Sequence, residues 1–420
     1  MELGAISLLI LLAVIAIGFF RKVNVGLVAI LAAILLGFAS GLFTANQIIS
    51  GFSSSLFMTL AGVTMVFAIV NSNKSLELLI KKIVSKMGRM VSLVPVVFFI
   101  FAWAVSASGP GLIPTAALVA VIAIPLAKQT GFNPVMLAMI GVHAANAGRF
   151  TMMTTEGNLV TDLLSEQGYM ENIMVELCLS VTILAAVLSV ITWACYKSWK
   201  VRDIVNMEGA DEKFTRNQIL SLIGMLAMVL LILIGKMQTG LAAFLVAAVL
   251  ILLGVANEKD VFKSMPWGTI IMVLGVGILM NLVIEVGGIE LLSKYLASVM
   301  TPRTASALSG LTAGVMSWFS STLGVVIPTL VPTVSHIVES IGGGVTALEI
   351  TAAIVFASST AGLSPASTAG SLILSGVIAD PDYKNTFKEE KLFVQLFLWA
   401  AVGIVIIALF ALAGYLKLFV

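Results

Sequence analysis

Apolar stretches long enough to cross a lipid bilayer recur along the whole chain, and this pattern limits what the chain can fold into. Of its 420 residues, 60% are hydrophobic and 10% are charged, with a mean hydropathy of +1.11. Because a soluble protein must cover its surface with polar groups, this composition predicts that the bilayer is the solvent. A spanning helix takes about 20 residues, so we expect one all-α polytopic membrane domain and no sizeable soluble domain.

Ten segments are candidate spanning helices, and two of them are interrupted by small and polar residues. The continuous candidates are residues 4–20, 25–43, 54–72, 172–196, 217–235, 239–256, 267–286 and 391–417, and the interrupted ones are 134–166 and 347–378. Between them, Leu76 to Met87 alternates apolar residues with lysines at helical spacing, which is typical of a helix lying along the interface. Ile289 to Met300 is the corresponding segment later in the chain.

Two further segments place a polar, helix-breaking sequence between apolar arms. Residues 91–127 surround Ser106-Ala107-Ser108-Gly109-Pro110-Gly111, and residues 304–340 surround Ser320-Ser321-Thr322-Leu323-Gly324. Such a sequence is costly inside lipid unless protein or water surrounds it. We therefore expect two re-entrant hairpins whose tips lie within the membrane. The alternative is a pair of complete spanning helices joined by an exposed loop, because arms of some 16 residues reach about 24 Å.

The second half of the chain repeats the first. Ile113-Pro114-Thr115 recurs as Ile327-Pro328-Thr329, Ala147-Gly148 as Ala361-Gly362, and Thr154 as Thr368, all at one constant offset along the chain. Each half holds five spans and a hairpin that returns to its own side. An odd number of crossings turns the second copy upside down, which predicts two inverted repeats, residues 1–205 and 206–420.

The distribution of Lys and Arg predicts the orientation. With the N-terminus outside, the inward-facing segments carry eighteen of these residues and the outward-facing segments carry four, Lys236, Lys294, Arg303 and Lys417. Positive residues collect on the cytoplasmic side. Both termini are therefore expected outside and the linker at 197–216 in the cytoplasm, so hairpin one opens inward, hairpin two opens outward, and their tips meet near the membrane centre.

Inverted repeats with broken helices are typical of secondary transporters, because unwound backbone offers free N–H and C=O groups at the midplane. Half-helix N-termini suit an anion, and carbonyl and hydroxyl oxygens suit sodium. The predicted substrate-binding residues are Ser106, Ala107, Ser108, Arg149, Ser321, Thr322, Ser364 and Pro365. The predicted sodium ligands are Ser106, Ser108, Asn146, Gly148, Ser320, Thr322, Thr360 and Gly362. The alternative is that these hydroxyls only satisfy helix backbone or pack against neighbours.

Arg149 is the most informative single residue, because it lies in the first helix break at predicted membrane depth. A charge there costs at least about 2.5 kcal/mol. A bound carboxylate would explain it; the alternative is an internal ion pair with Glu156 or Asp162, and the two can alternate. Glu156, Asp162 and His143 are the candidate proton sites, although a lone His in an apolar helix is commonly a packing residue.

At these residues the chain resembles the ion transporter superfamily, in particular its malonate-carrier-like branch beside the divalent anion/sodium symporters. The motifs that carry the resemblance are Asn46-Gln47-Ile48, Gly51-Phe52, Leu56-Phe57-Met58-Thr59-Leu60, Asn133-Pro134-Val135-Met136, and His143 through Ala147-Gly148. The resemblance implies a homodimer in a prokaryotic plasma (inner) membrane. It also implies a scaffold part and a mobile part that carries hairpins and broken helices across the membrane in an elevator-like step.

In the symporters, a Ser-Asn-Thr motif at each hairpin tip contacts the substrate carboxylate and sodium. The matching positions are Ser106-Ala107-Ser108 and Ser320-Ser321-Thr322, and both lack the Asn. Arg149 stands where malonate-carrier-like sequences tend to have a small residue, and we infer that this added cation replaces the lost amides.

The sequence thus predicts a secondary transporter of a small organic anion, a dicarboxylate, coupled to sodium. The alternative is proton-coupled anion transport or cation/proton antiport. An enzyme is not expected, because the chain has two His far apart, no HExxH and no paired membrane aspartates. No cofactor is expected beyond the coupling cation, and no basic patch indicates nucleic acid.

Overall fold

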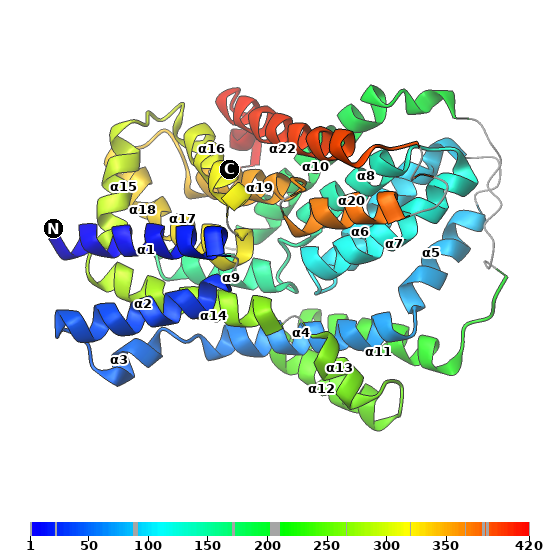
Figure 1. The fold of residues 1–420 in the computed structure, drawn as a ribbon, viewed down its shortest axis with the longest axis horizontal. Helices are drawn as coiled ribbons and strands as arrows, with labels where there is room; N and C mark the ends of the chain where they lie inside the picture. The colour runs from blue at the N-terminus through cyan, green and yellow to red at the C-terminus, as the bar shows by residue number, and fades with distance from the viewer. Residues whose placement is uncertain are drawn as a thin grey trace.

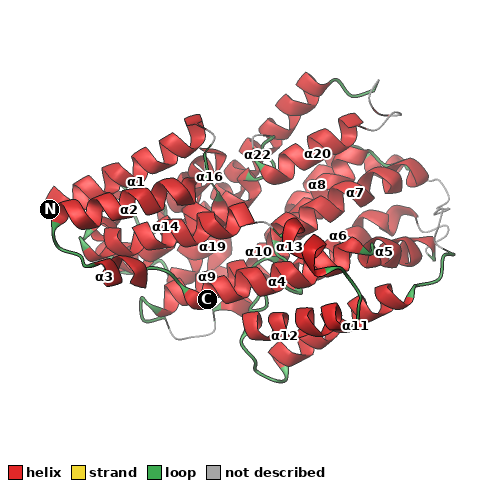
Figure 2. Cartoon of the chain, turned by 60° about the horizontal axis from the view of Figure 1, so that its bottom comes forward, coloured by secondary structure: helices red, strands yellow, loops and turns green. Residues whose placement is uncertain are grey.

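In a computed structural model, the chain is built from helices that lie side by side (Figures 1 and 2). The described residues are 2–21, 23–86, 91–169, 173–201, 211–265, 267–319, 321–365, 367–379, 383 and 386–419, and no strand occurs among them. This agrees with the predicted all-α class, since a chain in lipid must satisfy its backbone groups within helices or closed barrels.

The helices of the first half follow the predicted segments closely. They are α1 (Glu2–Arg21), α2 (Val25–Ser40), α3 (Ala45–Ser50), α4 (Ser54–Ser72), α5 (Ser75–Ser85), α6 (Val94–Ala107), α7 (Leu112–Thr130), α8 (Pro134–Gly148), α9 (Thr155–Ser165) and α10 (Met174–Cys195). α6 and α7 pack against each other around the turn at 108–111, as expected for hairpin one.

The second half has the same order. It contains α11 (Arg216–Leu233), α12 (Thr239–Leu252), α13 (Glu258–Ser264), α14 (Trp267–Glu285), α15 (Gly288–Ser298), α16 (Ala305–Phe319), the π-helical turn η3 (Thr322–Val326), α17 (Ile327–Leu330), the 3₁₀ turn η4 (Val331–Thr333), α18 (Val334–Ile341), α19 (Ala347–Ala361), α20 (Thr368–Ala379) and α22 (Glu389–Leu412).

The starting points of equivalent helices keep one spacing. α2, α4, α8 and α9 begin at residues 25, 54, 134 and 155, and α12, α14, α19 and α20 begin at 239, 267, 347 and 368, so the shift along the chain is constant to within one position. The caps recur as well: the side chain of Asn133 accepts from the Val135 N–H at the start of α8, and that of Thr346 accepts from the Glu349 N–H at the start of α19. The division into two inverted repeats stays a prediction with which this recurrence agrees.

The helices form two layers. The first layer contains α1–α4 and α11–α14, in which α2 packs on α14 and α4 on α12. The second layer contains α6–α10, α16–α20 and α22, in which α8 packs on α6, α7 and α10, and α19 packs on α16 and α22. In Figure 1, α4, α11, α12 and α13 lie along the bottom, and α8, α10, α19 and α22 lie above them. Both hairpins and both broken helices belong to the second layer.

Glycines allow the helices of the first layer to cross at short range. At the α2–α14 crossing, a Cβ on either Gly26 or Gly275 would overlap the backbone of the facing helix. At the α4–α12 crossing, a Cβ on Gly62 would lie 2.8 Å from the Gly240 carbonyl oxygen. The shift that relates the helix starts also relates Gly26 to Gly240 and Gly62 to Gly275, so both crossings use equivalent positions. Close approach at small residues is a common way for helices to pack in membranes.

The lengths of the helices and the bends between them determine which segments can cross the bilayer. Among the described residues, four segments are long and apolar enough to span alone, Leu112–Thr130, Met174–Cys195, Thr322–Ile341 and Lys391–Leu412, or up to six if each bent pair is one span. The bent pairs are α4–α5, at 65°, and α14–α15, at 79°. Bends of this size are expected where α5 and α15 turn along the interface. Because α7 is long enough to span, the complete-helix alternative for hairpin one stays open, and the number of crossings stays a prediction.

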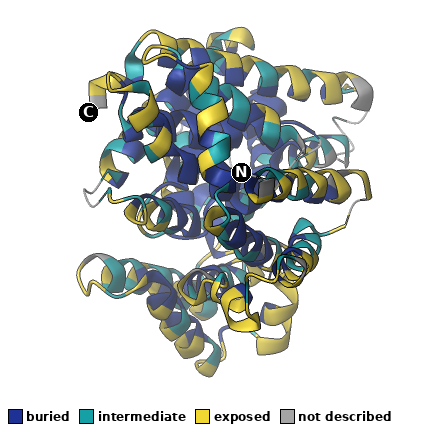
Figure 3. Cartoon of the chain, turned by 90° about the vertical axis from the view of Figure 1, so that its left-hand side faces the viewer, coloured by how far each residue is buried: buried dark blue, intermediate teal, exposed yellow. Residues whose placement is uncertain are grey.

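Large apolar side chains are exposed on the outer helices, which surround a buried interior (Figure 3). Leu9 on α1, Leu31 on α2, Leu252 on α12 and Leu409 on α22 are each more than half exposed. Exposed apolar surface over several helices is unfavourable in water but suits hydrocarbon. The chain is therefore an integral membrane protein.

The Gly275 crossing gives a test of the packing. Gly275→Ala should lower the free energy of unfolding by about 1–3 kcal/mol, and with it the melting temperature, because the added methyl would push α14 away from α2. The control is Gly277→Ala on the same helix, where the nearest atom to an added Cβ is the Gly51 oxygen at 3.6 Å. Tryptophan-fluorescence melting of both variants in detergent measures the difference; equal melting temperatures would contradict the close crossing.

Candidate functional site

The two broken helices end slightly later than the sequence predicts. α8 continues to Gly148 and α19 to Ala361, so Asn146 and Thr360 are still helical. The physical reason is that the Arg149 N–H still finds a helical acceptor, the Ala145 carbonyl oxygen at 3.1 Å. The backbone is irregular only from there to the next half-helix.

A hydroxyl closes each break in the same way. Thr154 Oγ1 donates to the Arg149 carbonyl oxygen, and Ser367 Oγ donates to the Gly362 carbonyl oxygen. The two donors and the two acceptors are related by the same shift, so the geometry pairs Thr154 with Ser367, one position before the Thr368 that the sequence comparison suggests. In this register Arg149 corresponds to Gly362, and the second break has no cation at that position.

Arg149 forms a buried ion pair with Glu156. Its Nη2 and Nε lie 3.1 and 3.2 Å from Glu156 Oε1, and its Nη1 lies 3.4 Å from Ser359 Oγ on α19. Both charged side chains are 3% exposed. Asp162, the other partner considered from the sequence, is exposed near the end of α9. The register that pairs Arg149 with Gly362 pairs Glu156 with Ala369, so both members of the ion pair are specific to the first half.

The carboxylate of Glu156 also lies at the N-terminus of α7, the second arm of hairpin one. Its Oε1 accepts from the Leu112 N–H at 3.3 Å, and its Oε2 accepts from Thr155 Oγ1 at 2.8 Å. Gly111, with φ of +68°, makes this approach possible, because a Cβ there would overlap both carboxylate oxygens. A helix N-terminus favours an anion through its free N–H groups and its dipole, so the predicted anion position is filled by a carboxylate of the protein.

The first tip is tied to the first break by hydroxyls. Ser106 Oγ donates to the Ala145 carbonyl oxygen at 2.8 Å, and Thr151 Oγ1 donates to the Ala107 carbonyl oxygen at 2.8 Å. Ser108 Oγ donates to a carbonyl one turn earlier in α6, also at 2.8 Å. These predicted site residues are therefore brought together at one place, where their hydroxyl hydrogens bind backbone oxygens.

The second tip is tied to the second broken helix in an equivalent manner. Ser317 Oγ and Thr322 Oγ1 both donate to the Ser358 carbonyl oxygen, at 2.8 and 2.9 Å. In the register of the two breaks, Ser358 corresponds to Ala145, the acceptor for Ser106. Ser321 Oγ accepts from the Gly324 N–H at 3.1 Å. Ser320, a predicted sodium ligand, lies outside the described residues.

The predicted residues of the second break are buried. Ser364 and Pro365 are both buried, and the Ser364 carbonyl oxygen accepts from the Ser367 N–H at 2.9 Å. The Gly362 carbonyl oxygen accepts from the Gly370 N–H at 3.0 Å. Gly148, the predicted sodium ligand in the first break, packs against the Trp103 backbone with no room for a side chain.

Several buried polar groups beside the breaks have no hydrogen-bond partner in the described part of the chain. They include both amide atoms of Asn146, the Thr360 hydroxyl and both ring nitrogens of His143. Asn146 and His143 lie one turn apart on α8, on the same face. Buried polar groups are normally satisfied, so an orphaned amide oxygen and a hydroxyl oxygen fit the oxygen ligands that sodium requires.

The first layer touches both tips through methionines. Met228 on α11 reaches Gly109, where a Cβ would lie 3.0 Å from the Met228 Cε, and Met225 Sδ lies 4.0 Å from Ser108 Oγ. On the other side, Met272 on α14 packs against Gly324, where a Cβ would lie 2.9 Å from the Met272 Cγ. Methionine is unbranched and adaptable, so these contacts can change without strong steric penalty.

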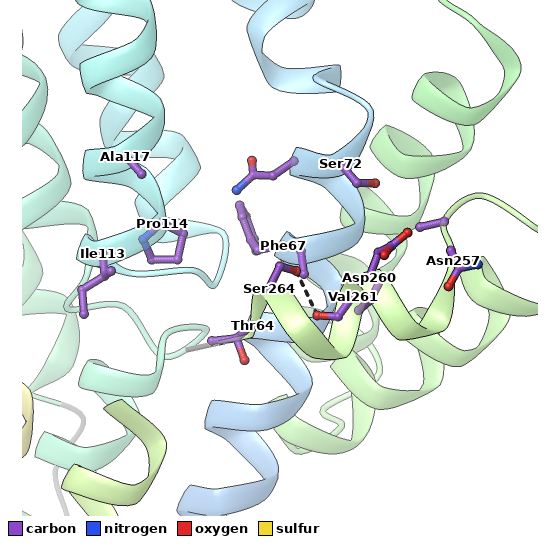
Figure 4. A pocket seen from close by; sticks show the side chains of 13 residues that line it. Thr64, Phe67, Ser72, Ile113, Pro114, Ala117, Asn257, Asp260, Val261 and Ser264 are labelled. Atoms are coloured by element: carbon purple, nitrogen blue, oxygen red, sulfur yellow. Dashed lines mark hydrogen bonds between the residues drawn. The ribbon is translucent and has the colours of Figure 1, made fainter. Parts of the chain in front are cut away.

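A cavity of about 670 Å³ lies between the two layers (Figure 4). Its walls come from α4, α13 and α7, and they end at Ile113 and Pro114, directly after the Leu112 N–H that binds Glu156. Its polar lining residues are Thr64, Asn71, Ser72, Asn257, Asp260 and Ser264. The sequence prediction missed this set, although Thr64 and Asn71 stand out as polar residues in the apolar α4.

These features define a class: a polytopic helical membrane transporter, with an ionic site between broken helices and hairpin tips. The sequence model of the citrate transporter family matches residues 9–354. The chain belongs to the citrate transporter family. It is therefore a transporter and not an enzyme.

The structural comparison agrees at the level of the fold. The crystal structure of the Alcanivorax borkumensis YdaH transporter, described as having an unusual topology, matches with a TM-score of 0.58 and 11% identity over 90% of this chain and 88% of that chain. No curated protein matches this chain. The resemblance to the ion transporter superfamily is supported by these matches, whereas the malonate-carrier-like branch stays a prediction.

The ion pair can be tested by a double-mutant cycle. Arg149→Met leaves the Glu156 charge buried without a partner, which should cost about 3–5 kcal/mol, and Arg149→Met combined with Glu156→Gln should recover most of that loss. The control is Lys81→Met in the partly exposed pair with Glu77, 2.9 Å apart, where about 1 kcal/mol or less is expected. Thermal unfolding of wild type, Arg149→Met, Glu156→Gln and the double variant measures the coupling free energy between the two residues. If the two single losses add up to the loss of the double variant, the direct pair is contradicted.

Proposed function

We propose that the chain is a secondary active transporter of a small organic anion with two or more carboxylates, and that Arg149 binds one of them. The observation that carries the proposal is the buried Arg149 side chain, 3% exposed, whose partner Glu156 lies at the N-terminus of α7. Arginine presents a planar fork of donors that fits a carboxylate. A site of this kind, lined otherwise by small and hydroxyl residues, is suited to a compact polycarboxylate.

The ion pair is present at the first break and has no equivalent at the second, and this difference favours a functional role of the pair over a purely structural one. If a break between half-helices required a charged pair for stability, the second break would need one too. It instead has Gly362 and Ala369 at the equivalent positions and is closed by the same type of hydroxyl bond. Because a membrane charge is costly and functional by default, Arg149 is best explained by a ligand.

Citrate is the first substrate to test, since it names the family, and the dicarboxylates malonate and succinate are the second, since the sequence resemblance implies them. We propose sodium as the coupling cation. Its ligands would be drawn from Asn146, Thr360, Gly148, Gly362 and the tip hydroxyls. The support is the orphaned oxygen atoms of Asn146 and Thr360 in helix segments that end at the breaks.

The two layers support an elevator-like mechanism. The first layer would act as the scaffold, and the second layer, with both hairpins, would carry the site across the membrane. The methionine contacts at both tips would ease sliding. The cavity between α4 and α7 is also lined by α13, which the positive-inside prediction places at the cytoplasm, and this favours an inward-facing state. We also propose a homodimer in a prokaryotic inner membrane, with both termini outside.

Proton-coupled anion transport or cation/proton antiport is the alternative, and Glu156 is the observation that favours it. It is a buried carboxylate in the site itself, and His143 is buried on the helix that leads to the same break. Asp162 is a weaker candidate because it is exposed. In this alternative the ion pair between Glu156 and Arg149, 3.1 Å apart, would have to separate during transport.

Arg149→Ala should abolish uptake of radiolabelled citrate, malonate and succinate into proteoliposomes under a sodium gradient, because the carboxylate anchor is lost. The control is Arg303→Ala at an exposed position, which should transport like wild type. Uptake that persists in Arg149→Ala would contradict the anchor, and uptake driven only by a proton gradient would replace sodium by protons.

A second set of variants separates the two cations. With sodium coupling, Thr322→Leu should abolish sodium-driven uptake by crowding the second tip, whereas His143→Gln and Asp162→Asn should retain it. Ser371→Leu, at an exposed hydroxyl on α20, is the control for the added bulk. Proton-driven uptake that is lost in His143→Gln or in Asp162→Asn would instead identify the substituted residue as the coupling group.

A further inference from the structure

Glu156 already occupies the position that the proposed function assigns to a substrate carboxylate. Its Oε1 receives the Arg149 guanidinium at 3.1 Å and the Leu112 N–H at 3.3 Å, and its Oε2 receives the Thr155 hydroxyl at 2.8 Å. Arg149 and the α7 N-terminus therefore have an anion in this state. A second carboxylate cannot bind the same donors unless Glu156 leaves them.

We propose that Glu156 is a tethered anion that fills the anion site when no substrate is bound, is displaced by the substrate carboxylate, and is then neutralised by the coupling cation. The inference rests on the proposed function and assigns to Glu156 the link between the anion and the cation. The coupling cation is monovalent, sodium or a proton, because either would neutralise the displaced carboxylate.

The charge balance supports this link. With Glu156 in place, one positive and one negative group cancel in a buried site. With a substrate carboxylate on Arg149, the Glu156 charge remains in the same low-dielectric region without a partner, which is strongly unfavourable. Anion binding therefore becomes favourable only together with a cation, and this requirement couples the two.

The main packing partners of Glu156 offer no replacement for Arg149. α9 packs against α4 and η4, and the tip at 108–111 borders the carboxylate through Gly111. None of these three segments contains a titratable side chain. On α9 itself the other ionisable residue is Asp162, which is exposed and acidic. Within these described segments a displaced Glu156 thus finds no protein cation, and a mobile cation must supply the charge.

The geometry also provides a route for exchange. The cavity wall ends at Ile113 and Pro114, next to the Leu112 N–H that Glu156 binds. An anion that moves along this wall reaches the α7 N-terminus first and Arg149 next. Gly111, which has no side chain, gives the Glu156 carboxylate its room beside the tip, and a substrate carboxylate that displaces Glu156 would use the same space.

The test measures citrate affinity of the purified full-length protein in nanodiscs, for wild type and Glu156→Gln. Each is measured in choline buffer, in sodium buffer, and over a pH range in which citrate keeps its full charge. Wild type should bind citrate weakly in choline and more tightly with sodium or with acidification. Glu156→Gln should bind about tenfold more tightly than wild type in choline and change by less than about twofold with either cation.

Glu156→Gln leaves the Arg149 charge unpaired, so the variant can be less stable, and citrate should then raise its melting temperature more than that of wild type. Glu156→Asp keeps the charge but has a shorter reach, so it should bind citrate more tightly than wild type and still depend on the cation. If Glu156→Gln retains the cation dependence of wild type, or if Glu156→Asp binds citrate more weakly, the tethered-anion proposal is wrong.

Failure of the proposed function and failure of the role of Glu156 give different results. Wild type that binds none of citrate, malonate and succinate under any condition would contradict the proposed function itself. Wild type that binds citrate with a cation dependence unchanged in Glu156→Gln would leave the transporter proposal intact and remove only the role of Glu156.

Discussion

A buried guanidinium in a membrane protein needs a negative partner, and several local features of this structure serve that need. The break after α8 lets Glu156 fold back onto Arg149 at 3.1 Å. Gly111 leaves room for the carboxylate at the N-terminus of α7, and Thr154 closes the turn by binding the Arg149 carbonyl oxygen. Without Glu156, the guanidinium would remain in a low-dielectric region without compensation. The broken helix, the hairpin tip and the ion pair are thus one unit.

Among the described residues, the charged pair is the part of this unit that has no counterpart later in the chain. Helix starts, caps, glycine crossings and tip hydroxyls recur at one nearly constant shift along the chain, but the second break has Gly362 and Ala369 in place of the charged pair. The shared features are those that a broken helix and a close crossing require physically. The unshared pair is the part to which the proposed function assigns the substrate carboxylate.

The sequence predicts the helices well because their limits are local. α4 is found at residues 54–72 as expected, and the breaks are marked by small and hydroxyl residues. Arg149 stands out because a charge in an apolar helix is costly. Its partner could not be chosen from the sequence, since Glu156 and Asp162 both follow the break and only the turn at Thr154 decides which faces back. The cavity was missed because α4, α7 and α13 meet only in the folded chain. The register that relates the two breaks depends on hydrogen bonds from the Thr154 and Ser367 hydroxyls to backbone carbonyls, which sequence identity does not reveal.

The central claim is that the substrate and Glu156 compete for the same donors. The most direct measurement is an experimental structure of the protein with citrate and the coupling cation bound. The account predicts a citrate carboxylate on Arg149 and on the Leu112 N–H, with the Glu156 carboxylate withdrawn from both and a cation or a proton beside it. A structure in which citrate is bound elsewhere while Glu156 keeps its contacts with Arg149 and Leu112 would contradict the claim.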